Sequence, residues 1–410
     1  MLKDSSRKLV VEGGERVIHF NTKQFKPVPE EGIEMAVEAM RAGIMYRYQP
    51  KEAELSRTTE LEERFSKHMG IKHVVGTNSC GSAMYIALNI AGVQPGDLVL
   101  TNAFTFQAVP SVIHHARAES VLVDCTREWG VDVQDLERQV IESGAKVFVL
   151  SYMRGHVPDM DGIMEVVDRH GLFLVEDCAH AYETFWDGKR LGTFGQISCF
   201  STQSSKGMSA GEGGLFCTED DVIAAKAALY AGSYERRWTR HKGLDPKVMD
   251  ELQNEIPGYS MRMQEVTAST LIPQVDRLPR IHEIHVRNWD RLHGQLHDHP
   301  NVEIPLPLPK VTPFKDTMQF HLVDLTPDQA QRFLDVMAME GVGMQIFGRN
   351  RNARDFRSWH YTEASKSLKE QTVSNIEFAC DLSLQPHLTE DDIDLLGSTL
   401  RQVLDFVAAE

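Results

Sequence analysis

Short apolar runs alternate with segments of helical periodicity between residues 61 and 177, and this pattern restricts the possible fold more than any other feature. Apolar strands separated by helices are typical of a parallel sheet with both faces covered, because each parallel connection needs a crossover. We therefore predict an α/β protein with a mostly parallel sheet. The predicted strands are residues 73–76, 97–100, 120–124, 146–151, 172–177, 197–201 and 214–218, and the predicted helices are 61–69, 83–91, 109–115 and 160–170.

The last third of the chain has a second, smaller α/β pattern. Long helical periodicity over residues 262–298 precedes it, and we expect breaks near Pro273 and Pro279. We predict a large domain over residues 1–255, including an N-terminal extension, and a small C-terminal domain over residues 256–410. The predicted elements of the small domain are a strand at 318–324 and helices at 327–339 and 389–408, after a proline-rich linker at 305–313.

The charge balance argues against two classes of partner. The 43 Lys and Arg residues face 59 Asp and Glu residues, and the resulting formal charge of -16 repels phosphate backbones and anionic lipids. We therefore expect neither a nucleic acid nor a membrane partner, and the first residues lack the apolar core of a signal peptide, so we expect a cytoplasmic protein. The six cysteines are scattered without CxxC pairs, so neither a disulfide framework nor a zinc site is indicated.

Lys206 lies in the stretch FSTQSSKGMSAGEGG at residues 200–214. Ser, Gly and Gln favour turns, so this stretch is a predicted loop. Two interpretations remain open for Lys206. It is either an inert surface lysine, as most lysines are, or an amine that a backbone cradle presents to a bound carbonyl compound.

The stretch GTNSCGSAM at residues 76–84 lies between a predicted strand and a predicted helix. Small residues there allow backbone amides at the helix start to converge on an anion, and the helix dipole favours negative charge at that end. This interpretation predicts a phosphate seat. The alternative is an ordinary strand-to-helix turn in which Ser82 caps the helix.

VEDCAH at residues 175–180 ends a predicted strand with Asp177 and His180. Ligands of open α/β sheets gather outside the carboxyl ends of the strands. A carboxylate that leaves a buried strand needs a cation or a hydrogen-bond donor, so we expect a cationic group to face Asp177. Alternatively, Asp177 caps the next turn and His180 is a core imidazole.

One small molecule unites these three features. Pyridoxal phosphate needs a phosphate cradle, a carboxylate that keeps its ring nitrogen protonated, and a lysine that forms a Schiff base. The sequence contains one candidate for each need.

At this point the sequence resembles the DegT/StrS-type sugar aminotransferases, which are fold-type I pyridoxal phosphate enzymes. The resemblance extends over most of the chain, and the ordered set of motifs is more specific than any single motif. The motifs are GTNSCGSAM, PGDLVLTNAFTFQAV, RGHVPDMDGIMEV, VEDCAHA, CFSTQSSKGMSAGEGG, PGYSMRMQEVTAS and LSLQPHLTEDDID.

The resemblance implies roles for four residues around the cofactor ring. Lys206 matches the Schiff-base lysine, and Asp177 matches the carboxylate that pairs with the pyridinium nitrogen. Phe106 matches the aromatic residue that stacks on the ring. His180 takes the place where the family has Gln or His beside the cofactor.

Four further residues match the family's phosphate site. Gly81 and Ser82 match the backbone that cradles the phosphate, and Ser201 matches a phosphate-binding hydroxyl. Arg262 takes the position from which a neighbouring subunit reaches the phosphate, where the family usually has Asn. The resemblance therefore implies a homodimer with shared active sites.

The implied function is transfer of an amino group from glutamate or glutamine to a keto sugar or keto cyclitol, in amino-sugar, cell-surface glycan or antibiotic biosynthesis. The alternatives are a dehydratase or cyclitol-processing enzyme on the same fold, and a non-catalytic regulator that keeps the fold. Family members that remove a hydroxyl have histidine in place of the lysine, so Lys206 favours transamination.

Two arginine-rich stretches, residues 234–242 and 348–357, are candidate anion sites in this acidic chain. The second lies where the family has a variable segment that faces the substrate. For both stretches, solvated surface arginine is the competing interpretation.

Overall fold

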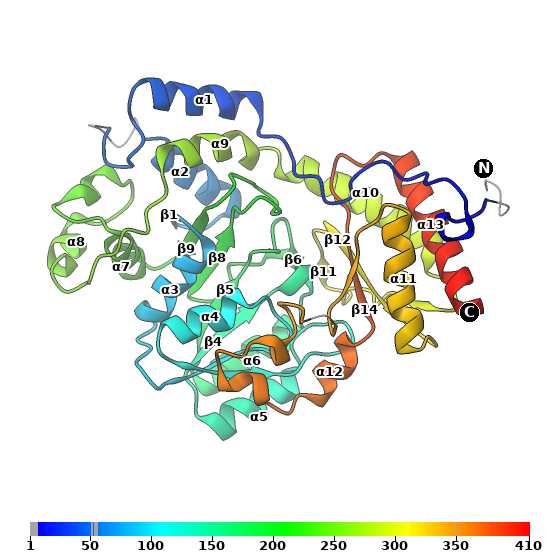
Figure 1. The fold of residues 1–410 in the computed structure, drawn as a ribbon. Coiled ribbons are helices and arrows are strands. Elements are labelled where there is room, and N and C mark those ends of the chain that lie inside the picture. Colours follow the sequence, from blue (N-terminus) through cyan, green and yellow to red (C-terminus); the bar gives the residue numbers. More distant parts are fainter. Residues whose placement is uncertain (1–6, 51, 53–55, 350) are drawn as a thin grey trace.

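The computed structural model describes residues 7–50, 52, 56–349 and 351–410. These residues form one large sheet, two smaller sheets and the helices around them (Figure 1). The predicted α/β class is therefore confirmed. The large sheet has the order β1-β9-β8-β5-β4-β2-β3, with β1 (His73–Thr77), β9 (Gly214–Thr218), β8 (Ile197–Ser201), β5 (Phe173–Asp177), β4 (Val147–Ser151), β2 (Leu98–Asn102) and β3 (Glu119–Val123).

The strand directions bring the ends of three central strands to one edge of the large sheet. Strands β3, β2, β4, β5 and β8 run parallel, whereas β9 runs antiparallel to both of its neighbours. In this register Ser151 of β4 is paired with Asp177 of β5, and Asp177 is paired with Cys199 of β8. Side chains and loops at these carboxyl ends therefore face one region above the sheet.

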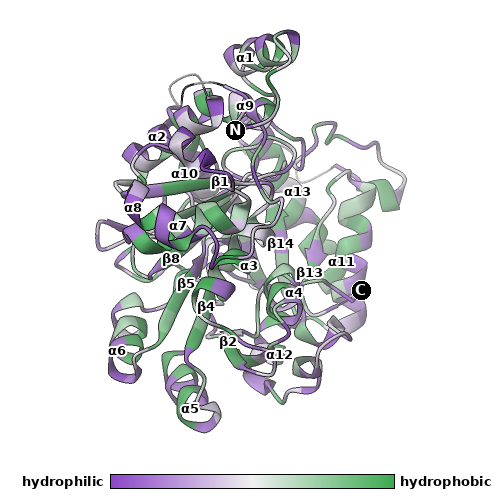
Figure 2. Cartoon of the chain, turned by 90° about the vertical axis from the view of Figure 1, so that its left-hand side faces the viewer, coloured by the Kyte–Doolittle hydropathy of each residue, from purple (hydrophilic) through white to green (hydrophobic). Residues whose placement is uncertain are grey.

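Helices cover both faces of the large sheet, and alternate residues of each strand face opposite layers. Phe148 and Leu174 belong to the layer formed with α2, α5, α6 and α9, whereas Val149 and Val175 belong to the layer formed with α3, α4 and α7. Strands β4, β5 and β8 are green in Figure 2, as expected for strands buried on both sides. The helices are α2 (Arg57–Met69), α5 (Val133–Ser143), α6 (Met160–His170), α9 (Glu265–Val275), α3 (Cys80–Ile90), α4 (Ala108–His115) and α7 (Asp221–Ala231).

A separate antiparallel sheet and three helices form the C-terminal core. The sheet has the order β10-β12-β14-β13, and Leu9 and Ile18 from the N-terminal segment are buried in the same apolar cluster. Arg7 pairs with Glu340 at 3.1 Å, so the first described residues are fixed to this region, as Figure 1 shows. The elements are β10 (Val302–Glu303), β12 (Thr317–Leu322), β14 (Ala379–Ser383), β13 (Gln345–Ile346), α10 (Leu278–Leu296), α11 (Pro327–Met339) and α13 (Glu390–Ala409).

The remaining elements pack around these two cores. Helix α1 (Glu30–Arg41) packs along α9, as Figure 1 shows at the top of the molecule. No helix within the described ranges is long and apolar enough to cross a membrane, including α10 and α13 with 19 and 20 residues. The other elements are α8 (Pro246–Leu252), α12 (Glu370–Ile376) and a small sheet of β11 (Val311–Thr312), β6 (Phe185–Trp186) and β7 (Lys189–Arg190).

One predicted helix break is displaced. Pro273 lies inside α9, which continues to Val275, and the break falls between α9 and α10, where Pro279 occupies the first turn of α10. A proline near the end of a helix removes only one backbone hydrogen bond. Pro273 packs closely against α1, since a Cβ added to Gly32 would lie 3.2 Å from the Pro273 ring.

Candidate active site

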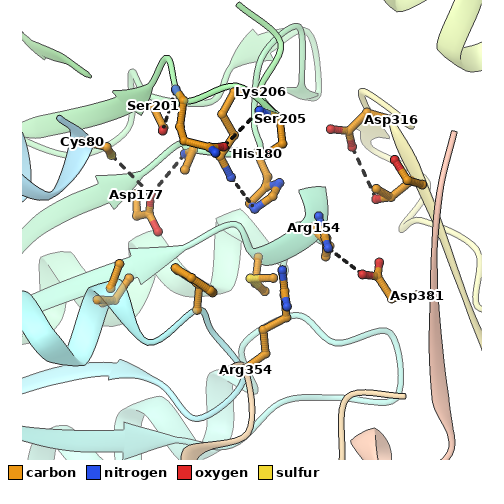
Figure 3. Close-up of a pocket in the computed structure, with 18 of the residues that line it drawn as sticks. Cys80, Arg154, Asp177, His180, Ser201, Ser205, Lys206, Asp316, Arg354 and Asp381 are labelled. Carbon is orange, nitrogen blue, oxygen red and sulfur yellow. Dashed lines mark hydrogen bonds and ion pairs between the residues drawn. The ribbon is translucent and has the colours of Figure 1, made fainter. Parts of the chain in front are cut away.

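Lys206 lies on the loop of residues 202–213, which joins the antiparallel strands β8 and β9. The Thr202 amide donates to the Gly213 carbonyl at 3.0 Å and closes the base of this loop. Gly207 is required next to Lys206, because a Cβ there would lie 2.7 Å from the Tyr182 ring. The loop is therefore packed down onto the protein, and Lys206 faces the cavity shown in Figure 3.

The cavity has a volume of about 600 Å³ and lies above the carboxyl ends of the central strands. Its size is within the range of ordinary small-molecule sites. Six of the eight residues singled out in the sequence line it, although they come from segments far apart in the chain. These residues are Gly81, Phe106, Asp177, His180, Ser201 and Lys206.

Lys206 and His180 contact each other through nitrogen atoms. The Nζ atom of Lys206 lies 2.9 Å from Nε2 of His180. Burial lowers the pKa of Lys206 to about 8, and the nearby charge of Arg154 adds to this effect. Burial also holds the pKa of His180 well below its usual value, and the Lys206 charge contributes. A neutral imidazole therefore accepts a hydrogen bond from the ammonium form of Lys206.

Asp177 ends β5 and is 6% exposed. Its carboxylate accepts hydrogen bonds from the Ser151 hydroxyl at 2.7 Å and from the Ala179 amide at 3.1 Å. Burial raises the pKa of Asp177, and these two bonds oppose the rise. Within the described part of the chain, no cationic side chain forms an ion pair with Asp177. The cationic partner expected for Asp177 is therefore not in direct contact with it among these residues.

The first turn of α3 points its backbone toward the same cavity. Ser79, and not Ser82, caps this helix, because the Ser79 hydroxyl accepts a hydrogen bond from the Ser82 amide at 3.0 Å. The amides of Cys80 and Gly81 precede the first intrahelical hydrogen bond, so helix geometry leaves them available to an anion. A Cβ on Gly214 would lie 2.4 Å from the Ser79 backbone, so glycine is needed where β9 passes this turn.

Two predicted site residues lie outside the cavity lining. Ser82 points back toward Asn78, to which its hydroxyl donates at 2.6 Å. Arg262 lies over the rings of Tyr46 and Tyr234 at 5.3 and 5.6 Å and donates to the Gly232 carbonyl at 2.9 Å. The prediction for Arg262 concerns a neighbouring subunit, so it stays a prediction.

The other side of the cavity has charged residues that are not among the eight predicted site residues. Arg154 pairs with Asp381 at 2.6 Å, and Arg354, Asp316 and Gln345 also line this side. Arg354 belongs to the arginine-rich stretch at 348–357, so that stretch contains one arginine that faces the cavity. Arg154 lies in the motif RGHVPDMDGIMEV, where only its backbone is unusual, with φ of 56°.

The residues around the cavity fit pyridoxal phosphate. Asp177 is a buried carboxylate without an ionic partner among the described side chains, which suits a protonated ring nitrogen. Lys206 has an amine with a lowered pKa, which suits a carbonyl group. The start of α3, with Ser201 near it, has the amides and hydroxyl that a phosphate needs.

The mostly parallel seven-stranded sheet, the smaller C-terminal sheet and this cavity define the fold-type I class of pyridoxal-phosphate-dependent enzymes. The family model for the DegT/DnrJ/EryC1/StrS aminotransferase family matches residues 30–401. The chain therefore belongs to this family, whose members use pyridoxal phosphate, and the resemblance seen in the motifs is confirmed.

Two relatives indicate the range of the family. The spore coat polysaccharide biosynthesis protein SpsC of Bacillus subtilis is 31% identical over 263 residues, which cover 63% of this chain and 65% of SpsC. A putative L-glutamine:3-amino-2,3-dideoxy-scyllo-inosose aminotransferase of Micromonospora echinospora is 30% identical over 219 residues, covering 53% of this chain and 50% of that protein. The matched segment thus spans about half to two thirds of the length of these relatives.

A solved structure extends the fold comparison to nearly the whole chain. The putative sugar aminotransferase Spr1654 of Streptococcus pneumoniae, in its PLP form, superposes with a TM-score of 0.79 at 21% identity. The superposition covers 94% of this chain and 99% of that one. The likeness supports the fold-type I assignment for both the large sheet and the C-terminal region.

Proposed function

We propose that this protein is a pyridoxal-phosphate-dependent aminotransferase that moves an amino group from glutamate or glutamine to a keto sugar or keto cyclitol. The observation that supports it most is the convergence of Lys206, Asp177 and the first turn of α3 on one cavity. The product would enter amino-sugar, cell-surface glycan or antibiotic biosynthesis.

Lys206 has the central role in this proposal. When bound, pyridoxal phosphate supplies an electron-withdrawing ring and a carbonyl group that condenses with amines. Lys206 would hold the cofactor by condensing with this carbonyl with loss of water, and when a donor amine replaces it, the freed Lys206 amine would be positioned to move the donor's Cα proton. A pKa of about 8 leaves part of the Lys206 population unprotonated near neutral pH, so the amine is able to accept that proton.

Asp177 would act at the ring nitrogen of the cofactor, and His180 acts at the amine of Lys206. The negative charge of Asp177 would favour a proton on the ring nitrogen, and the Ser151 and Ala179 bonds hold the carboxylate in one orientation. His180 orients the amino end of Lys206 through the 2.9 Å contact. The phosphate would be held by the amides of Cys80 and Gly81 and by the Ser201 hydroxyl, and the ring would stack on Phe106. Ser82, whose amide and hydroxyl are bonded to Ser79 and Asn78, would support this turn.

We also propose a homodimer in which Arg262 reaches the phosphate of the neighbouring subunit. The exposed position of Tyr259, close in sequence to Arg262, is compatible with such a contact. A cytoplasmic location remains part of the proposal, since the six cysteines are free and buried. The division into domains at residue 256 stays a prediction.

The test compares a Lys206→Ala variant with a Lys247→Ala control, which removes an exposed lysine of α8. Wild-type and control proteins should show a visible absorbance band that borohydride removes, and they should transfer nitrogen from glutamate or glutamine to a keto sugar or keto cyclitol. Lys206→Ala should do neither. A band without amine transfer would favour the regulator, and elimination of a hydroxyl group would favour the dehydratase.

A further inference from the structure

Two guanidinium groups face each other inside the cavity. Arg154 follows β4, and Arg354 comes from the segment between β13 and α12, yet Figure 3 shows their side chains directed toward one another. Burial lowers the pKa of Arg354 to about 10, and the charge of Arg154 contributes. Two like charges brought together away from water are unfavourable unless an anion joins them.

Only Asp381 forms an ion pair with either arginine among the residues described, and its oxygens are already occupied. They accept from Arg154 at 2.6 Å, from Gln319 at 2.8 Å and from Gln345 at 2.6 Å. The pair therefore accounts for the charge of Arg154. The Asp381 charge also attracts Arg354, but among the described residues no carboxylate forms an ion pair with Arg354.

Asp316 is the other carboxyl group on this side of the cavity. The cations that act on it are Arg154, Lys206 and Lys26, and burial raises its pKa. Among the described residues, Asp316 forms no ion pair with Arg354.

The hydrogen-bond donors of Arg354 are also largely unused. A guanidinium has five N–H donors, but Arg354 reaches an acceptor of the described chain only at 3.5 Å, through Oδ1 of Asn352. Its Nε atom is buried without an acceptor there, and so is Nε of Arg154. In contrast, Arg47 directs both terminal nitrogens to the carboxylate of Glu62.

Aromatic contacts hold Arg354 in position but do not neutralise its charge. Its guanidinium carbon lies 5.4 Å from the ring centre of Phe106 and 6.0 Å from that of Phe347. These contacts hold the guanidinium plane at the cavity wall. A planar fork fixed in this way is suited to two parallel hydrogen bonds with a carboxylate.

We propose that Arg354, with Arg154 beside it, is a subsite that binds a substrate carboxylate. This inference rests on the proposed function, because it assigns the carboxylate to one of the two substrates of that reaction. The carboxylate belongs either to the amino donor or to an acidic acceptor such as a uronic acid. Both sources present the same chemistry to Arg354.

The experiment measures binding to the holoenzyme by calorimetry, without turnover. The probes are glutarate, which resembles the donor without its amine, D-glucuronate, which resembles an acidic acceptor, and D-glucose as the neutral counterpart. The variant Arg354→Met removes the charge and keeps the stem against Phe106. The control Arg351→Met removes an exposed charge from the same segment.

Arg354→Met should weaken binding of at least one acidic probe by about tenfold or more, the size expected for a lost charge-assisted bond. An effect on glutarate alone identifies the donor, an effect on glucuronate alone identifies the acceptor, and an effect on both shows a shared subsite. Arg354→Lys should recover only part of the affinity, because lysine lacks the fork. D-Glucose binding should not respond to Arg354→Met.

Two results overturn the proposal: wild type that binds neither acidic probe, or equal losses in Arg354→Met and Arg351→Met. Thermal unfolding of each variant shows whether the substitution destabilises the fold. If Arg354→Met is destabilised, binding of the acidic probes to Arg354→Lys tests the proposal instead. Because no turnover is needed, carboxylate binding without amine transfer would leave the subsite standing and remove the proposed function.

Discussion

Lys26 Nζ donates hydrogen bonds to the backbone carbonyls of Lys206 and Gly207, each at 2.8 Å. A residue of the N-terminal segment therefore holds the loop that bears the proposed Schiff-base lysine. Burial lowers the pKa of Lys26 to about 8, and Asp316 opposes this shift. The contact joins segments 180 residues apart in the sequence.

Replacing Lys26 with Met should loosen this loop. Two buried hydrogen bonds to carbonyls are lost, and we expect amide hydrogen exchange over residues 203–213 to accelerate by about tenfold. The control is Lys23→Met, because Lys23 also lines the cavity but is exposed. Equal exchange rates in the two variants would show that Lys26 does not position the loop.

The lowered pKa of Lys206 predicts a pH-dependent stability difference. Folded Lys206 gives up its proton near pH 8, whereas the unfolded chain keeps it to about pH 10.5, so the buried charge destabilises the cofactor-free protein below pH 8. Cofactor-free Lys206→Met should therefore be more stable than wild type at pH 7, by on the order of 2 kcal/mol. This advantage should shrink as the pH rises from 8 to 10.5. Denaturant unfolding at several pH values measures it, and a pH-independent difference would contradict the assignment.

Asp177→Asn should preserve the site geometry but remove its negative charge. The asparagine oxygen still accepts from the Ala179 amide, and the Ser151 hydroxyl is able to reorient. We expect the rate of the half-reaction with glutamate to fall by about 100-fold or more, as for other losses of proton control. Stopped-flow absorbance gives the rate, and Ser151→Ala is the milder comparison. Unchanged rates in Asp177→Asn would remove its proposed role.

Gly214→Ala should damage the anion seat directly. The added Cβ would lie 2.5 Å from the Cys80 amide nitrogen, so either β9 or the start of α3 must move. We expect a loss of about 2 kcal/mol or more in unfolding free energy, together with weaker binding of pyridoxal phosphate. Gly294→Ala is the control, because nothing lies within 4 Å of its added Cβ. Denaturant titration measures the unfolding free energy, and equilibrium dialysis measures the binding of pyridoxal phosphate.

The sequence pattern predicted the large sheet well because its strands are buried on both faces. Such strands read as continuous apolar runs, and strands β8 and β9 match their predicted ranges at both ends. Helix α5 was not among the predicted helices, although Asp132 caps it and Gly144 ends it. The short strand β13 has only two residues, which is too little for a periodic signal.

The sequence predicted those site residues that a motif places at the end of a strand or in the loop after it. Asp177 and Lys206 follow this rule, and the structure brings both to one cavity. Arg154 and Lys26 were not selected, and Arg354 was included only as part of the candidate anion stretch 348–357, because a charged residue within a loop gives no local sign of burial. Their positions depend on how the C-terminal sheet and the N-terminal segment pack against the large sheet.

The burial of Leu9 and Ile18 in the C-terminal core has a consequence for biosynthesis. These two residues leave the ribosome long before helix α13 (Glu390–Ala409), which completes their surroundings. This core therefore cannot close until α13 has been made, although the large sheet is able to fold earlier. Until then, Leu9 and Ile18 lack the apolar neighbours that bury them in the finished fold.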